Sequence, residues 1–282
     1  MKNIILSLSL IIFIMTASVA QQKPASSGYA PVNGLKIYYE TYGEGAPLVL
    51  LHGAFMTIGT NWSQLIPELA KTHKVIAVEM QGHGRTADID RPYSYTALAD
   101  DVAGLLKYLN IKKTDVIGYS FGAPISYQMA IAHPQLVGKL VIISGVYKRA
   151  GWLPQVQQAI SGITPEVFAS SPIKQVYDSL APNPSHWAKF ITKMVKFAAE
   201  DFDLGEDNIK HLSSPVLLIM GDNDGVDLQY TARTYQLLGG GIPGDMAAMP
   251  KSQLAIIAGA SHVGLMGKTE ILSGLILPFL SK

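Results

Sequence analysis

The stretch DVIGYSFGAPISYQMA, residues 115–130, combines two patterns that indicate how the chain folds. Its first part is apolar and predicts a buried strand, and its last part has the spacing of a helix. Ser120 stands between them, with Gly118 and Gly122 two residues away on either side. We expect a sharp strand-to-helix turn, because a Cβ at either glycine would collide with a neighbouring strand or helix. Such a turn exposes the serine hydroxyl beside unpaired N–H groups at the start of a helix.

The same alternation of strand and helix extends along the chain in both directions. Continuous apolar runs predict buried strands at 46–53, 74–80, 114–120, 138–144, 214–221 and 252–259. Helical spacing predicts helices at 61–71, 94–110, 122–133 and 269–280. This order predicts an α/β fold, in which a mostly parallel sheet is flanked by helices on both faces.

One segment interrupts the alternation. Residues 146–212 are helical in pattern, rich in aromatic residues and punctuated by proline, which indicates a helical lid inserted into the core. The core domain is then formed by residues 21–145 and 213–282. Within it, residues 33–45 predict a β-hairpin. The polar stretch 21–32 predicts a mobile lead-in.

The first residues have the pattern of a signal peptide. Lys2 supplies the positive charge, residues 4–17 are apolar, and residues 18–20 carry small side chains suited to cleavage before Gln21. We therefore expect residues 1–20 to be removed and the protein to be exported, either periplasmic or secreted, without membrane contact after cleavage. An uncleaved N-terminal anchor is the alternative.

Composition excludes several classes of function. The 282-residue chain is 48% hydrophobic with a net charge of +1, so no basic surface for nucleic acid is expected. There is no cysteine, which excludes disulfides and thiolate metal sites. The chain also lacks zinc-protease and EF-hand motifs, so no metal and no cofactor is expected.

Four motifs together resemble a known family. They are LLHGAF (50–55), GYSFG (118–122), MGDND (220–224) and GASHVG (259–264). Their order is similar to that of the α/β-hydrolase fold superfamily, in particular to lidded, single-domain serine esterases. The resemblance extends over residues 30–282.

This resemblance implies a catalytic triad. A serine hydroxyl is a poor nucleophile without a general base, and the base needs an orienting carboxylate. The family order of serine, acid and histidine assigns these roles to Ser120, Asp224 and His262. Asp222 is an alternative acid, and both aspartates could instead be turn residues.

The resemblance also implies an oxyanion hole. Its expected donors are the backbone N–H groups of Ala54 and Phe121, with Phe55 as the alternative to Ala54. The family position of His52 suggests that it braces this loop, whereas His83 is expected to be only a turn residue.

Apolar side chains near these motifs predict the substrate pocket. The expected lining residues are Phe55, Met56, Tyr119, Trp152 and Trp187. The insertion supplies further large side chains, namely Phe168, Tyr177, Met194, Phe197 and Phe202. Such residues suit an apolar ligand, although they could equally pack the lid onto the body.

The predicted function is hydrolysis of a small or medium apolar carboxylic ester or lactone through an acyl-enzyme on Ser120. Perhydrolysis and cleavage of an amide, thioester or carbon–carbon bond are the alternatives within this fold. A low-turnover ligand-binding protein is a further one. A serine nucleophile disfavours haloalkane dehalogenase and epoxide hydrolase chemistry, which proceeds through an enzyme carboxylate.

Overall fold

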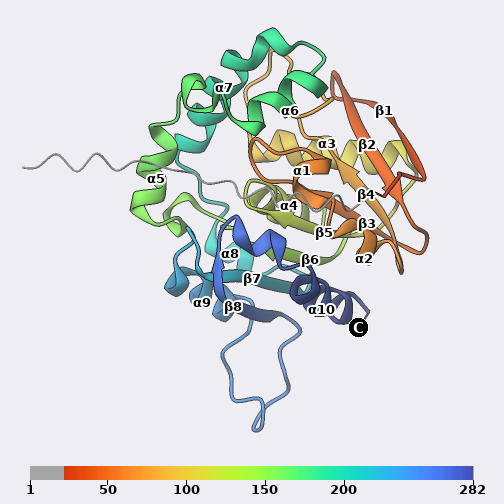
Figure 1. The fold of residues 1–282 in the computed structure, drawn as a ribbon. Coiled ribbons are helices and arrows are strands. Elements are labelled where there is room, and N and C mark those ends of the chain that lie inside the picture. Colours follow the sequence, from red (N-terminus) through yellow and green to blue (C-terminus); the bar gives the residue numbers. More distant parts are fainter. Residues whose placement is uncertain (1–21, 282) are drawn as a thin grey trace, which may run out of the picture.

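The computed structural model describes residues 22–281 and shows one sheet of eight strands, in the order β1-β2-β4-β3-β5-β6-β7-β8 (Figure 1). The predicted signal peptide at residues 1–20 lies outside the described residues. The strands are β1 (Ser26–Val32), β2 (Leu35–Tyr42), β3 (Ala46–Leu51), β4 (His73–Val78), β5 (Thr114–Tyr119), β6 (Val137–Ile143), β7 (Val216–Asn223) and β8 (Gln253–Ser261). The predicted mostly parallel sheet is confirmed, since β2 alone runs against its neighbours.

Helices follow most of the strands. The α-helices are α1 (Ile58–Trp62), α2 (Ile66–Leu69), α3 (Tyr95–Tyr108), α4 (Gly122–Ala132), α5 (Pro154–Ser161), α6 (Pro172–Leu180), α7 (Trp187–Ala199), α8 (Glu206–Lys210), α9 (Leu228–Leu237) and α10 (Thr269–Leu280). Short 3₁₀ turns are η1 (Arg149–Gly151), η2 (Pro165–Phe168), η3 (Pro184–His186) and η4 (Gly264–Gly267). No helix within residues 22–281 is both long and apolar enough to cross a bilayer.

The N-terminal hairpin lies earlier in the chain than predicted. Residues 26–32 form β1, which pairs with β2 through a tight turn at Asn33 and Gly34, where φ is 49° and 83°. Asn-Gly favours such turns because both residues tolerate positive φ. The prediction of a mobile lead-in is therefore wrong for residues 26–32, and the helix predicted at 61–71 is divided between α1 and α2.

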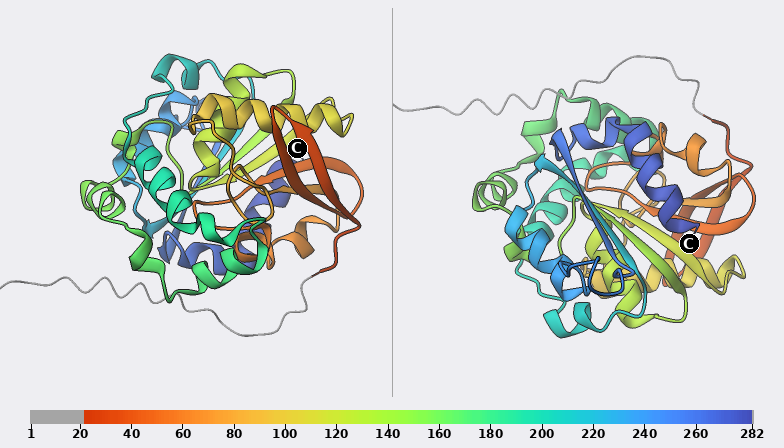
Figure 2. Two further views of the ribbon diagram at one scale, coloured as in Figure 1. Left: turned by 90° about the horizontal axis from the view of Figure 1, so that it is seen from above. Right: turned by 90° about the horizontal axis from the view of Figure 1, so that it is seen from below.

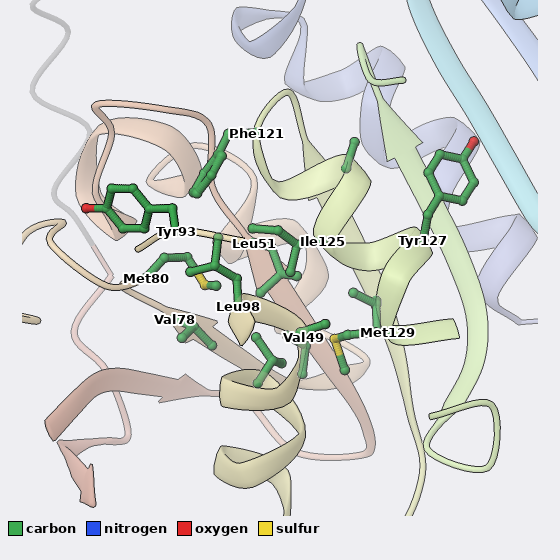
Figure 3. Packing of buried hydrophobic residues seen from close by; sticks show 14 of the residues in the cluster. Val49, Leu51, Val78, Met80, Tyr93, Leu98, Phe121, Ile125, Tyr127 and Met129 are labelled. Atoms are coloured by element: carbon green, nitrogen blue, oxygen red, sulfur yellow. The ribbon is translucent and has the colours of Figure 1, made fainter. Parts of the chain in front are cut away.

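Helices cover both faces of the sheet (Figure 2). The core consists of two apolar layers, one on each face. Side chains alternate along each strand, so Val49 and Leu51 face α3 and α4, whereas Leu48 and Leu50 face α1, α2 and α10. Figure 3 shows the first layer, where Leu51 lies near Ile125 of α4. These buried layers hold the strands rigidly, and the loops that follow the strands inherit that rigidity.

The predicted insertion lies between β6 and β7. Its helices α5, α6 and α7 gather at one end of the molecule (Figure 1). Its last helix, α8, contacts α4 and α9, so the end of the segment 146–212 packs on the body rather than over the site. The long link 238–252 projects away from the body and exposes 86% of Met246 and 75% of Met249.

Candidate active site

Ser120 occupies the predicted turn between β5 and α4. Its φ is 51°, in the left-handed region, which L-residues rarely adopt. The N–H of Ser120 donates to the carbonyl of Ile143 at 3.0 Å, and its carbonyl accepts from the N–H of Ala123 at 3.0 Å. The strained turn is thus tied to β6 and α4, and it presents a partly exposed hydroxyl above the sheet.

The two flanking glycines are required by contact with the body. A Cβ on Gly118 would lie 2.3 Å from the Oγ of Ser126. A Cβ on Gly122 would lie 2.1 Å from the carbonyl oxygen of Leu51. Both distances are far below van der Waals contact, so the strand, the turn and the helix can approach only with glycine at both positions.

Three residues from separate loops form one hydrogen-bonded chain. His262 follows β8, and its Nε2 lies 3.0 Å from the Oγ of Ser120. Its Nδ1 lies 2.8 Å from Oδ1 of Asp224, which follows β7. An ionised carboxylate can only accept, so Nδ1 carries the proton and Nε2 is left to accept the serine proton. This geometry suits a serine nucleophile with a general base.

Asp224 is buried and fully hydrogen-bonded. Its Oδ2 accepts from the hydroxyl of Ser144 at 2.5 Å, and Oδ1 also accepts from the N–H of Val226 at 3.2 Å. Burial raises the pKa of Asp224. The hydrogen bond and charge of His262, followed by the hydrogen bonds from Ser144 and Val226, outweigh burial, so the pKa lies below its ordinary value. The carboxylate therefore stays charged beside the imidazole.

Asp222, the alternative acid, lies elsewhere. Its exposed carboxylate accepts from the N–H of Ala260 at 3.1 Å and from Nδ2 of Asn223 at 2.8 Å. Backbone N–H groups of Gly259 and Ala260 lower its pKa. Asp222 thus ties β7 to β8, and Asp224 is the aspartate that reaches His262.

The loop after β3 distinguishes the two possible oxyanion donors. The N–H of Phe55 donates to Nε2 of His83 at 3.3 Å, and the N–H of Gly53 donates to Oδ1 of Asn61 at 2.7 Å. Within residues 22–281, the N–H groups of Ala54 and Phe121 donate to no protein acceptor. These two donors therefore remain for an oxyanion, and Phe55 is already engaged.

Two buried histidines hold this loop. Nδ1 of His52 donates to the carbonyl of Gly53 at 2.8 Å, and its Nε2 accepts from the N–H of Met80 at 3.1 Å. Burial lowers the pKa of His52 to about 4. Burial, and then the nearby His52, lower the pKa of His83 well below its ordinary value. Both rings are thus neutral, and His83 is more than the turn residue that was expected.

A small hollow lies between the oxyanion loop and the lid. Its walls are formed by Phe55, Met56, Thr57, His83, Gly84, Ile173, Val176, Tyr177, Trp187 and Phe190. Three of the five expected pocket residues, Phe55, Met56 and Trp187, are therefore here. None of the walls carries a charged side chain, because His83 is neutral, so the hollow suits an apolar group.

The other two expected pocket residues surround His262. Tyr119 is 1% exposed, its ring stacks on the imidazole with centroids 5.2 Å apart, and its hydroxyl donates to the carbonyl of His262 at 3.1 Å. Tyr119 therefore supports the histidine from behind and does not line the hollow. Trp152 meets the same imidazole edge-on, with centroids 5.4 Å apart.

The remaining large side chains of the lid have mixed roles. Tyr177 lines the hollow, and Phe168 lies 5.4 Å from Phe55 between ring centroids. Met194 is 1% exposed and belongs to the core. Phe197 and Phe202 both pack on Tyr95 of α3, so they hold the lid on the body.

The contacts of Ser144 and His83 with site residues escaped the sequence analysis. Ser144 follows β6 and has φ of 49°, and its hydroxyl donates to Asp224, 80 positions along the chain. His83 meets Phe55, 28 positions away. No local pattern marks either contact, since each depends on how distant loops converge. Residues 22–281 hold no cluster of three or more His, Asp or Glu side chains that could bind a metal.

Comparison with known proteins identifies the family of the chain. The model of the Alpha/beta hydrolase family matches residues 48–269. The chain belongs to this family. The matched range contains all four motifs, including those that carry Ser120, Asp224 and His262.

Among curated proteins, this hydrolase is 36% identical over 113 residues to a 2-hydroxymuconate semialdehyde hydrolase of Pseudomonas sp. strain CF600. The aligned region covers 39% of this chain and 40% of that protein. The chain thus spans less than half the length of this relative. An uncharacterized hydrolase of Bacillus subtilis is 25% identical over 275 residues, covering 88% of the chain and 96% of that protein.

Among solved structures, a meta-cleavage product hydrolase from Pseudomonas fluorescens IP01 superposes with a TM-score of 0.69. It is 21% identical, and the superposition covers 92% of this chain and 98% of that one. At this identity the likeness supports the fold alone.

Proposed function

We propose that this hydrolase cleaves a small or medium apolar carboxylic ester or lactone through an acyl-enzyme on Ser120. The observation that carries the proposal is the continuous hydrogen-bonded chain from Ser120 through His262 to Asp224. Two unengaged N–H groups, of Ala54 and Phe121, stand on the loops beside it.

Acylation follows from this arrangement. Nε2 of His262 removes the proton of Ser120 as Oγ attacks the substrate carbonyl carbon. The carbonyl oxygen becomes an oxyanion, and the N–H groups of Ala54 and Phe121 stabilise it. Asp224 stabilises the imidazolium. The tetrahedral intermediate then collapses, and His262 gives its proton to the departing alkoxide, which leaves as an alcohol.

Deacylation reverses these roles. His262 removes a proton from water, the resulting hydroxide attacks the acyl carbon, and the second intermediate expels Ser120, which recovers its proton from the imidazole. In a lactone the alcohol and the acid belong to one molecule, so one hydroxy acid is the product.

The hollow supports the apolar substrate class. Phe55 and Met56, which follow Ala54 in the chain, form part of its wall, so the hollow lies next to the oxyanion loop. The hollow is small, and its wall has no charged side chain. An ionic substrate would lose its hydration there without a counter-charge, whereas a short alkyl or aryl group would not.

Carbon–carbon bond hydrolysis is the second candidate. The relative from Pseudomonas sp. is a semialdehyde hydrolase and shares 36% identity over 113 residues. We propose to separate the two with a substrate panel of p-nitrophenyl esters, lactones, a thioester, an anilide and a 2-hydroxymuconate semialdehyde. Turnover of the semialdehyde well above that of every ester and lactone would refute ester specificity.

The activated serine is tested with a fluorophosphonate probe on the purified chain, followed by peptide mapping. We expect a single adduct on Ser120, absent from Ser120→Ala. A folded protein without an adduct would refute the proposed nucleophile and would favour the ligand-binding alternative.

We also propose that the protein is exported. The charged, apolar and small-residue regions within residues 1–20 support this proposal. Cell fractionation and N-terminal sequencing test it, with a mature chain starting at Gln21 as the expected result. An intact chain in the cytoplasm would contradict it.

A further inference from the structure

The stretch QGHGRT is built to bring one side chain inward. A Cβ on Gly82 would lie 2.4 Å from the hydroxyl of Tyr93, and a Cβ on Gly84 would lie 2.3 Å from a buried carboxyl carbon. Both glycines also have positive φ, at 76° and 52°. The chain can therefore make this double turn only with glycine on both sides of His83. The imidazole between them is 1% exposed.

The hydrogen bonds of His83 define its tautomer. Nδ1 lies 3.0 Å from the carbonyl oxygen of Gln81 and donates to it. Nε2 is thereby left as an acceptor, and it receives the N–H of Phe55 at 3.3 Å. Neither bond belongs to the proton transfers of the proposed reaction, so the ring has a different task.

That task is visible in the loop after β3. Phe55 has φ of 62°, an unfavourable conformation for an aromatic residue that persists only when its surroundings enforce it. Two N–H groups of this loop donate to side chains outside it. The N–H of Gly53 donates to Asn61, and the N–H of Phe55 donates to His83. Between these two bonded N–H groups, the N–H of Ala54 donates to no acceptor among residues 22–281.

We propose that His83 is a positioning residue of the oxyanion hole, which holds Phe55 so that the N–H of Ala54 faces the reacting carbonyl. The inference rests on the proposed acyl-transfer function and adds a residue to it.

The ring of His83 also contacts the second donor and the lid. It stacks on the side chain of Phe121 with centroids 5.5 Å apart and 24° between planes. It meets Phe190 of α7 edge-on, with centroids 4.9 Å apart. One imidazole therefore connects both oxyanion loops with the lid helix that walls the hollow.

A pair of nearly isosteric variants isolates the hydrogen bond. Both His83→Gln and His83→Met lose the ring, but only glutamine keeps an oxygen that can accept the N–H of Phe55. His83→Phe keeps a ring without the acceptor. His73→Phe is the control, because His73 is also buried but begins β4, at the end of that strand opposite the end from which the chain leads to His83.

The assay is hydrolysis of p-nitrophenyl butyrate, with rates expressed per fluorophosphonate-titrated site so that unfolded protein does not count. We expect kcat of His83→Met and His83→Phe to fall about tenfold to a hundredfold with little change in KM, because the donor matters mainly in the transition state. Inhibition by an alkyl trifluoromethyl ketone, which forms an oxyanion on Ser120, should weaken by a similar factor. His83→Gln should recover most of kcat, and His73→Phe should match the wild type.

Equal kcat for the glutamine and methionine variants, or a wild-type kcat in His83→Phe, would overturn the positioning role. A rise in KM alone would also overturn it, since that result would describe a pocket wall. A wild-type chain that the fluorophosphonate does not label would refute the proposed function itself, and this inference with it.

Discussion

Replacing Ser144 by alanine removes one hydroxyl from the support of Asp224. That hydroxyl donates to Oδ2 at 2.5 Å, and the only other donor to this oxygen among residues 22–281 is the N–H of Gly221 at 3.5 Å. Both side chains are buried, so water cannot replace the bond. A hydrogen bond to a charged group contributes about 2 kcal/mol, and we expect Ser144→Ala to lower the unfolding free energy by about this amount at pH 7.

The pH dependence follows from the pKa of Asp224, which lies below its ordinary 3.8. A lowered carboxyl pKa contributes stability that is present above pH 3.8 and is lost as pH falls through the folded pKa. Ser144→Ala brings that pKa closer to 3.8. The stability deficit of the variant should therefore be full at pH 7 and should shrink below pH 3.8.

Catalysis should weaken as well. In Ser144→Ala, Oδ1 of Asp224 still accepts from His262, so the imidazole remains in place. The carboxylate that orients it, however, has lost one of its hydrogen bonds. We expect kcat to fall about tenfold, equivalent to about 1.4 kcal/mol of transition-state stabilisation. Ser144→Gly loses the same hydroxyl but relieves the φ of 49°, so it should share the catalytic loss with a smaller stability loss.

Urea unfolding at several pH values and ester turnover measure these effects. The matched control is Ser214→Ala, because Ser214 is buried and donates to a neutral carbonyl, that of Val137, at 3.2 Å. Its stability loss should not depend on pH in this range, and its kcat should be normal. A deficit for Ser144→Ala below about 0.5 kcal/mol at pH 7, or one with no pH dependence, would refute the reasoning.

Four further substitutions test separate contacts. Tyr119→Phe keeps the ring on His262 but loses its hydrogen bond at 3.1 Å, so kcat/KM should fall about threefold to tenfold; an unchanged value would show that stacking suffices. Asp224→Asn should lower kcat about a thousandfold or more, whereas Asp222→Asn should stay near wild type; the reverse order would contradict the assigned acid. Burial raises the pKa of Glu79 from 4.5 to about 7, so between these pH values the folded state binds more protons than the unfolded state. The free energy of unfolding should therefore decline by about 3 kcal/mol as pH rises through this window. Glu79→Gln should abolish that decline in urea unfolding measured at pH 5 and 7.5, and a slope that persists would exclude Glu79 as its source.

Much of the lid was predictable only in outline. Its aromatic residues indicated an apolar surface, but sequence could not tell wall from packing, because both need the same side chains. In the structure Trp187 lines the hollow, whereas Phe197 and Phe202 join the lid to α3. The choice depends on which face of each helix meets the body, and that is a property of the whole arrangement.

Local sequence patterns predict the alternation of strands and helices, the turn at Ser120 and the order of the motifs that carry Ser120, Asp224 and His262. Each depends on neighbours in the chain: apolar runs, helical spacing, and glycines whose missing Cβ permits a sharp turn. Contacts between distant segments distinguish Asp224, which reaches His262, from Asp222, and they show that the N–H of Phe55 is engaged by His83. The fold also brings Ser144 to Asp224 and His83 to Phe55. These outcomes depend on hydrogen bonds between groups that are distant in sequence, and only the folded sheet brings such groups within 3.5 Å.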